Sequence, residues 1–146
     1  MKILMDANVA LDVLLERQPF YVSGIKILSL SKGGIELFLS ASTVTDIYYI
    51  IRKELKKKET ALTLLKNLLA SVDVAAVTNN EIHRAIDLNW DDLEDAVQYA
   101  SGETIAVDYL VTRNTSDFSA ADYPVVTPDE LLSILIDERS ENENDV

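Results

Sequence analysis

The residues in this sequence best suited to chemistry are acids. The 146-residue chain has 25 Asp and Glu, a single histidine and no cysteine. Asp6 is the first acid, and it ends the short apolar run of Ile3, Leu4 and Met5. That run is too short for a buried helix and predicts a strand buried on both faces. A carboxylate there is costly to desolvate unless something positive meets it. Because ligands bind at the carboxyl ends of parallel strands, Asp6 predicts a site.

Four more acids lie just past a predicted strand or at a predicted helix start. They are Asp46, Asp92, Asp95 and Asp117. Each has a structural explanation when taken alone. Asp46 and Asp92 favour a helix N-terminus through the helix dipole and capping, and Asp117 suits an Asx turn. Those explanations do not account for the placement of all four acids at the same edge of the sheet as Asp6. In a parallel α/β sheet, the strand ends and helix starts coincide at that edge.

Carboxylates gathered at one edge repel, and a divalent cation is the usual remedy. Ligand sets of oxygen alone suit Mg²⁺ or Mn²⁺. Such a metal polarises a phosphate, lowers the pKa of a bound water and neutralises developing charge, which is the apparatus of phosphodiester hydrolysis. The acids therefore predict a metal-dependent hydrolase.

Short apolar strands that alternate with helices predict the elements that position these acids. Further strands are predicted at Ile35–Leu39, Val72–Val77, Tyr109–Thr112 and Val125–Val126. Helices are predicted at Asn8–Leu15, Pro19–Lys32, Thr43–Lys57, Thr60–Ala70, Thr78–Asn89, Asp91–Ile105 and from Thr127 onward. The alternation favours an α/β fold with a central, mostly parallel sheet of four to five strands flanked by helices. The chain has four glycines and no phosphate-binding glycine motif, which argues against a nucleotide fold.

Composition predicts one domain, residues 1–136, followed by an acidic and disordered tail, 137–146. The tail carries a net charge of −4 out of −12 for the chain. The remaining −8 opposes nucleic-acid binding unless acids hold a cation. No apolar run approaches the length of a membrane span, and acids interrupt the N-terminal apolar stretch, so we expect a cytoplasmic protein without a signal peptide.

Three stretches resemble the PIN-domain ribonucleases, particularly the small prokaryotic proteins related to VapC-like toxins. They are MKILMDANVALDVLL, DLEDAVQYA and LVTRNTSDF, and the ending from Pro124 to Glu130 adds to the resemblance, which spans about Lys2 to Ile136. The resemblance implies a PIN fold, Mg²⁺ or Mn²⁺, and endonucleolytic cleavage of RNA. It also implies a homodimer and an antitoxin partner.

Carried over residue by residue, the resemblance assigns four catalytic acids. They are Asp6, Asp46, Asp95 and Asp117, of which Asp6, Asp95 and Asp117 would hold the metal. Supporting polar positions are Asn8, Asp92, Thr112 and Asn114. Asp46 departs from the family, which usually has glutamate there. Being shorter, Asp46 would orient or deprotonate the attacking water instead of binding metal. The products would carry a 5′-phosphate and a 3′-hydroxyl.

Two cationic features could contact RNA. Arg113, beside the acids, could bind a phosphate or form a structural ion pair. Five cations between Arg52 and Lys58 could contact the RNA backbone or complement a helix C-terminus.

Two other functions compete with the nuclease. The first is a phosphotransferase with Asp6 as nucleophile, as in dehalogenase-like phosphatases or response-regulator receivers. Those families require a lysine late in the chain near the acids, and the last lysine here is Lys66. A PIN-like module that binds RNA or protein without cleaving is the second alternative.

Overall fold

The computed structural model describes residues 1–144 and has the predicted α/β architecture. Its five strands form one sheet, and every neighbouring pair is parallel. The strands are β1 (Lys2–Met5), β2 (Glu36–Ser40), β3 (Asp73–Ala75), β4 (Tyr109–Val111) and β5 (Val125–Val126). All five predicted strands are present, with ends that differ by a few residues.

The order of the strands across the sheet is β3-β2-β1-β4-β5. The chain builds outward from β1 through β2 to β3, and then returns to place β4 on the other side of β1. Strand order therefore reverses between β1 and β4. In open parallel sheets, the crevice beyond the carboxyl ends of the strands at such a switch point is where ligands bind. Asp6 and Thr112 directly follow these two strands.

β1 is buried on both faces of the sheet, as its uninterrupted apolar run predicts. Ile3, Leu4 and Met5 are all fully buried. Ile3 and Met5 belong to the larger core cluster, whereas Leu4 belongs to a second cluster with Leu110 and Phe118. This division follows the alternation of side chains along a strand.

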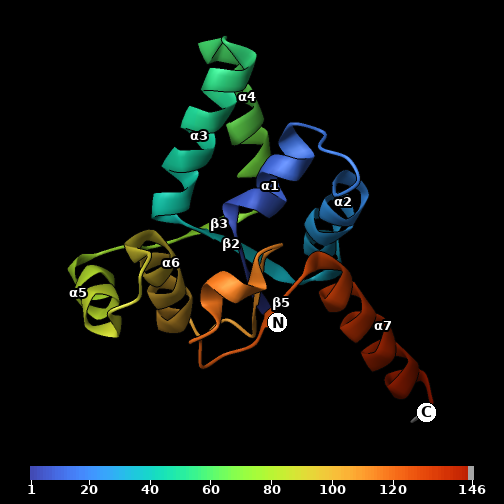
Figure 1. Ribbon diagram of the computed structural model, residues 1–146. Helices are drawn as coiled ribbons and strands as arrows, with labels where there is room; N and C mark the ends of the chain where they lie inside the picture. The colour runs from blue at the N-terminus through green and yellow to red at the C-terminus, as the bar shows by residue number, and fades with distance from the viewer. Residues whose placement is uncertain (145–146) are drawn as a thin grey trace.

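Seven α-helices and two 3₁₀ helices within residues 1–144 cover the sheet. The α-helices are α1 (Ala7–Leu14), α2 (Tyr21–Ser29), α3 (Ala41–Leu55), α4 (Lys58–Leu68), α5 (Asn79–Leu88), α6 (Leu93–Thr104) and α7 (Pro128–Asn144), and the 3₁₀ helices are η1 (Leu30–Gly33) and η2 (Thr115–Phe118). Residues of α1 to α4 and α7 join the larger core cluster. In Figure 1, α3 and α4 rise together as a hairpin, while α5 and α6 lie side by side at another end of the molecule. No helix among these is long and apolar enough to cross a membrane.

The acidic tail predicted to be disordered is helical as far as Asn144, because α7 continues through it. The helix starts as predicted, with Thr127 accepting a hydrogen bond from the Glu130 backbone N–H (3.2 Å). Leu131 is buried, but residues 136–144 are exposed. No proline or glycine interrupts the segment, so a helix begun on the core extends into solvent. The last two residues of the predicted tail lie outside the described residues.

Replacing Leu4 with alanine should lower the free energy of unfolding by about 2–5 kcal/mol, because it leaves a cavity between the central strand and α6. The measurement is urea unfolding followed by circular dichroism. Leu62→Ala is the matched control, since Leu62 is 45% exposed, and it should change stability by less than about 0.5 kcal/mol. Equal losses in the two variants would contradict this account of the core.

Candidate active site

Asp6 lies at the switch point and is held by four hydrogen bonds. It caps α1, with Oδ1 accepting from the Ala7 backbone N–H (2.7 Å) and from Gln98 Nε2 (3.2 Å). Its Oδ2 accepts from Thr112 Oγ1 (2.7 Å) and from Asn8 Nδ2 (3.3 Å). The carboxylate is therefore fixed in orientation by groups from α1, from α6 and from Thr112, which directly follows β4.

The environment of Asp6 opposes its ionisation on balance. Burial raises its pKa most, the hydrogen bonds from Thr112 and Ala7 lower it, and the negative charge of Asp117 raises it again. A carboxyl whose pKa is raised despite such partners is one that a bound cation would stabilise.

Asp95 and Asp117 come from other elements and act electrostatically on Asp6. Asp95 lies in the first turn of α6, and Asp117 lies in η2. Burial first, and then the charges of Asp92, Asp6 and Asp117, raise the pKa of Asp95 to about 6. The structure thus brings the three acids predicted to hold a metal into one electrostatically coupled group.

Asp92 has the structural role that its position predicts. It is the N-cap of α6, and its Oδ1 accepts from the Asp95 backbone N–H (3.0 Å). Its charge still adds to the negative field at Asp95. Asn114 enters the neighbouring network through its backbone N–H, which donates to Thr112 Oγ1 (3.0 Å).

Asp46 differs from the other three acids in its surroundings. It was expected in the first turn of its helix, but α3 begins at Ala41, so Asp46 lies in the second turn. Its carboxyl is paired with that of Glu94. A hydrogen bond to Asp46 first, and then burial and the charges of Asp46, Asp92 and Asp95, raise the pKa of Glu94 to about 7.

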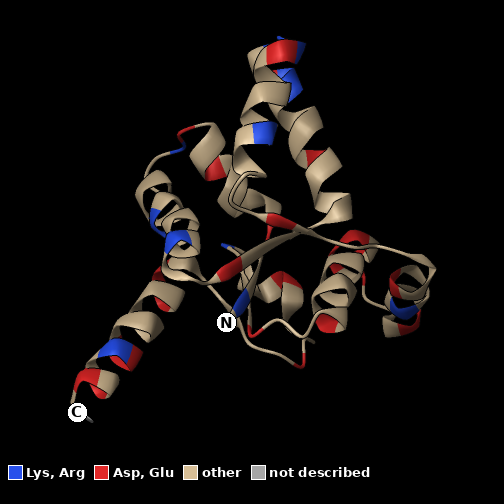
Figure 2. Cartoon of the chain, turned by 180° about the vertical axis from the view of Figure 1, so that it is seen from behind, with Lys and Arg blue, Asp and Glu red and all other residues tan. Residues whose placement is uncertain are grey.

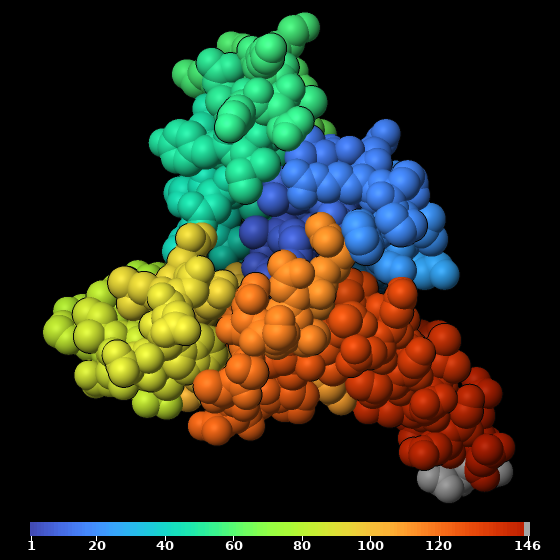
Figure 3. All heavy atoms as spheres, in the orientation of Figure 1, coloured from blue at the N-terminus to red at the C-terminus, as the bar shows by residue number. Residues whose placement is uncertain are grey.

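The donor set fits a hard divalent cation in its chemistry, since it consists of carboxylate oxygens. Within residues 1–144, no three Asp, Glu or His side chains are gathered closely enough to form a finished coordination sphere. A hollow of about 480 Å³ opens beside these acids, lined by Trp90, Asp92, Asp95, Asp117 and others. Figure 3 shows the dark-blue N-terminal segment recessed between the teal α3, the yellow segment that leads into α6 and the orange η2 region.

Arg113 has the structural ion pair that was one of its two predicted roles. Its Nε and Nη2 donate to the two oxygens of Asp12, at 2.7 and 3.1 Å. Its guanidinium also lies 4.0 Å from the centroid of the Phe20 ring. Asp12 is 1% exposed. The ion pair satisfies a buried charge, and a contact of Arg113 with phosphate stays a prediction.

Sequence reasoning did not single out three residues of this neighbourhood: Asp12, Glu94 and Gln98. Glu94 falls within the DLEDAVQYA stretch, but the resemblance assigns it no role. Gln98 and Asp12 fall on helix faces whose neighbours are apolar, and polar residues at such buried positions need a partner. That requirement was the available signal, but spacing alone cannot say which residue the partner is.

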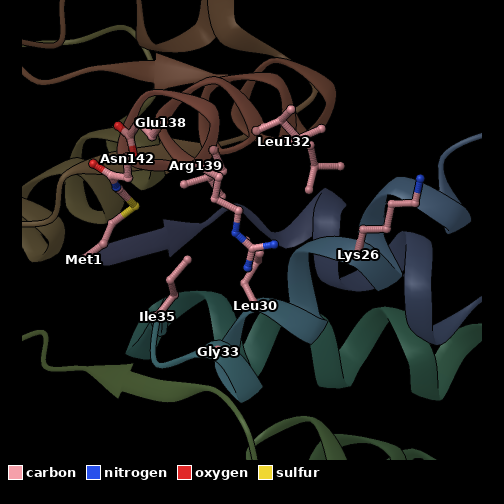
Figure 4. Close-up of a pocket in the computed structure, with 11 residues that line it drawn as sticks. Met1, Lys26, Leu30, Gly33, Ile35, Leu132, Glu138, Arg139 and Asn142 are labelled. Atoms are coloured by element: carbon pink, nitrogen blue, oxygen red, sulfur yellow. The ribbon is translucent and has the colours of Figure 1, made fainter. Parts of the chain in front are cut away.

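A second hollow, of about 410 Å³, lies at the opposite edge of the sheet. Met1 and Ile35, which precede β1 and β2, line it together with Leu30 and residues of α7. Figure 4 shows Arg139 of α7 reaching across it toward Leu30. It lies at the amino ends of the strands and gathers no cluster of acids, so it is not part of the candidate site.

Arg113→Ala should lower the free energy of unfolding by about 3 kcal/mol, because it leaves the buried Asp12 carboxylate without a partner. Urea unfolding measures the loss, and the double variant Asp12→Leu/Arg113→Leu should recover most of it. A large loss of cleavage without loss of stability would instead place Arg113 on the substrate.

The sequence and the fold were compared with known proteins. Residues 2–116 match the model of the PIN domain. Ribonuclease VapC1 of Aquifex aeolicus (strain VF5) is 31% identical over 137 residues, which cover 88% of this chain and 92% of that protein.

Solved structures share the fold at lower identity. A toxin-antitoxin complex from Klebsiella pneumoniae superposes with a TM-score of 0.64 at 22% identity, over 86% of this chain and 97% of that one. VapC20 of Mycobacterium tuberculosis, described as a toxin that cleaves the sarcin-ricin loop, gives a TM-score of 0.61 at 12% identity, over 74% and 86%. The match over most of the sequence sets aside the phosphotransferase alternative. The chain belongs to the PIN-domain family and is a homologue of the VapC ribonucleases.

Proposed function

We propose that this protein is an endoribonuclease that depends on Mg²⁺ or Mn²⁺ and hydrolyses RNA phosphodiester bonds at its Asp cluster. The observation that carries the proposal is the half-buried Asp6 at the switch point, in electrostatic contact with Asp95 and Asp117. Homology to VapC ribonucleases supports it.

Five cationic side chains between Arg52 and Lys58 lie at the far end of the α3–α4 hairpin, away from the Asp cluster (Figure 2). They do not neutralise the charge of that cluster, so binding of an RNA phosphate there depends on a bound divalent metal ion.

In this scheme Asp6, Asp95 and Asp117 would hold the metal. When bound, the metal polarises the phosphate, lowers the pKa of a water and neutralises developing charge. Thr112 and Asn8 keep the Asp6 carboxylate in place through their hydrogen bonds. Asp46 orients the attacking water or takes its proton, and a protonated Glu94 donates to Asp46. No residue of the protein forms a covalent bond to the substrate.

We also propose that the protein is the toxin of a toxin-antitoxin pair. Relatives of the same fold were crystallised as such complexes, including the Klebsiella pneumoniae structure. A homodimer is part of this proposal. Ile82 and Ile86, one turn apart on α5, are 40% and 56% exposed and offer an apolar face for it. Light scattering of the purified protein, alone and with its antitoxin, measures both assemblies.

Cleavage of labelled single-stranded RNA tests the nuclease. Wild type should cut with Mg²⁺ or Mn²⁺ and not with EDTA, leaving 5′-phosphate ends. Asp6→Asn and Asp95→Asn should reduce cutting to background, because each removes a metal ligand. Asp46→Asn should slow it by roughly 10²- to 10⁴-fold, the range for loss of a general base.

Ser31→Ala, on η1 at the other end of the sheet, is the control for these variants. If wild type is folded, binds metal and cuts no RNA, including structured RNA, the non-catalytic module is the better description. Cutting that persists in both Asp→Asn variants would mean a contaminating nuclease.

The raised pKa values of Glu94 and Asp95 predict how stability depends on pH without metal. Between about pH 4 and pH 7 the folded protein binds more protons at these groups than the unfolded chain does. Their contribution to stability is therefore present below pH 4 and is lost as pH rises through 6 and 7. The variant Glu94→Gln/Asp95→Asn should match wild type at pH 4 and exceed it in stability at pH 8, in urea unfolding with EDTA.

Mg²⁺ provides the second arm of this experiment. It should stabilise wild type at pH 8 and should stabilise the double variant less, since one ligand is gone. A stability difference between the two proteins that is the same at pH 4 and pH 8 would contradict the electrostatic account.

A further inference from the structure

Gln98 makes two buried hydrogen bonds that connect three elements of the site. Its Nε2 donates to Asp6 Oδ1 (3.2 Å), and its Oε1 accepts from Thr43 Oγ1 (3.1 Å). Gln98 is 4% exposed and Thr43 is 3% exposed. The three residues come from α6, α3 and the end of β1. Gln98 lies within the DLEDAVQYA stretch that resembles the family, but the sequence assigned no role to it or to the side chain of Thr43.

The chemistry of the partners fixes which way the amide points. An ionised Asp6 can only accept hydrogen bonds, so it must face the NH₂ group of the amide. Gln98 then presents Oε1 to Thr43, whose hydroxyl supplies the proton. Thr43 therefore satisfies the buried Oε1 atom in the amide orientation that Asp6 requires.

The same two residues lie one helical turn from two further acids. Gln98 follows Asp95 by three positions on α6, and Thr43 precedes Asp46 by three positions on α3. Residues three apart lie on one side of a helix. A single buried bridge thus ties the backbone segments that carry Asp95 and Asp46 to the carboxylate of Asp6.

We infer that Gln98, oriented by Thr43, is a positioning residue that sets the Asp6 carboxylate for metal binding and fixes α3 and α6 around it. The inference rests on the proposed metal centre. Without Gln98, Asp6 Oδ1 would keep only its bond to Ala7, within its own cap. The carboxylate would then be held from β4 and α1 but would lose its connection to the two helices that carry the other acids.

The test is Mn²⁺ affinity measured by titration calorimetry on the full chain, beside the melting temperature and RNA cleavage at several Mn²⁺ concentrations. Gln98→Leu should weaken Mn²⁺ binding by roughly 10- to 100-fold, the range for loss of an outer hydrogen-bond partner. High Mn²⁺ should restore much of its cutting. Thr43→Val should weaken binding in the same direction, and Thr43→Ser, which keeps the hydroxyl, should restore it.

Ser101→Ala is the matched control. Ser101 is fully buried one turn further along α6, and its hydroxyl donates only to the backbone oxygen of Gln98 (2.7 Å). It should lose thermal stability without losing Mn²⁺ affinity.

Two results would overturn the inference. If the folded Gln98→Leu variant binds Mn²⁺ as tightly as wild type does, Gln98 acts only in packing. If Thr43→Val and Thr43→Ser bind Mn²⁺ with equal affinity, the hydroxyl of Thr43 has no part in positioning. Failure of wild type itself to bind Mn²⁺ would reject the proposed metal centre, and this inference with it, which separates the two failures.

Discussion

The structure depends on holding a half-buried carboxylate at the end of its central strand, close to other carboxylates. Asp6 follows β1, whose residues Ile3 to Met5 are fully buried, and its own half-buried side chain is held by hydrogen bonds from α1, α6 and Thr112. Four hydrogen-bond donors compensate part of the desolvation, yet the pKa of Asp6 stays above its usual value. The remaining electrostatic cost is what makes the site receptive to a cation.

The parallel topology brings the other charges to that place. Strand order reverses between β1 and β4, so the segments that follow these strands face one crevice, and the helices that begin at the same edge add their first turns to it. Asp95 arrives on α6 and Asp117 on η2, although they are 89 and 111 positions from Asp6 in the sequence. Burial, and then the like charges of neighbouring acids, raise the pKa values of Asp6 and Asp95.

The replacement of the family's usual glutamate by Asp46 is connected to Glu94. The shorter side chain of Asp46 is paired with Glu94 at the start of α6, and the pair has room for one shared proton. The Glu94 carboxyl, whose pKa is raised to about 7, can hold a proton near neutral pH. A second carboxyl, that of Glu94 on α6, therefore lies beside the shorter Asp46.

Sequence patterns alone determined the fold class, the five strands and the order of the acidic motifs. Short apolar runs and capping residues are local signals, and a strand buried on both faces, such as Ile3–Met5, carries a strong one. Composition predicts disorder from residue 137 onward, whereas α7 continues to Asn144, because composition does not reveal that a helix begun on packed residues continues past them.

Only the tertiary structure decided which polar groups meet. Three contacts join residues that are 48 to 101 positions apart in the sequence. They are the Arg113–Asp12 pair, the Asp46–Glu94 pair and the bridge from Thr43 through Gln98 to Asp6. Sequence shows that a buried polar side chain needs a partner but not which one. The partner is set by how the helices pack on the sheet, a property of the whole fold that no local spacing encodes.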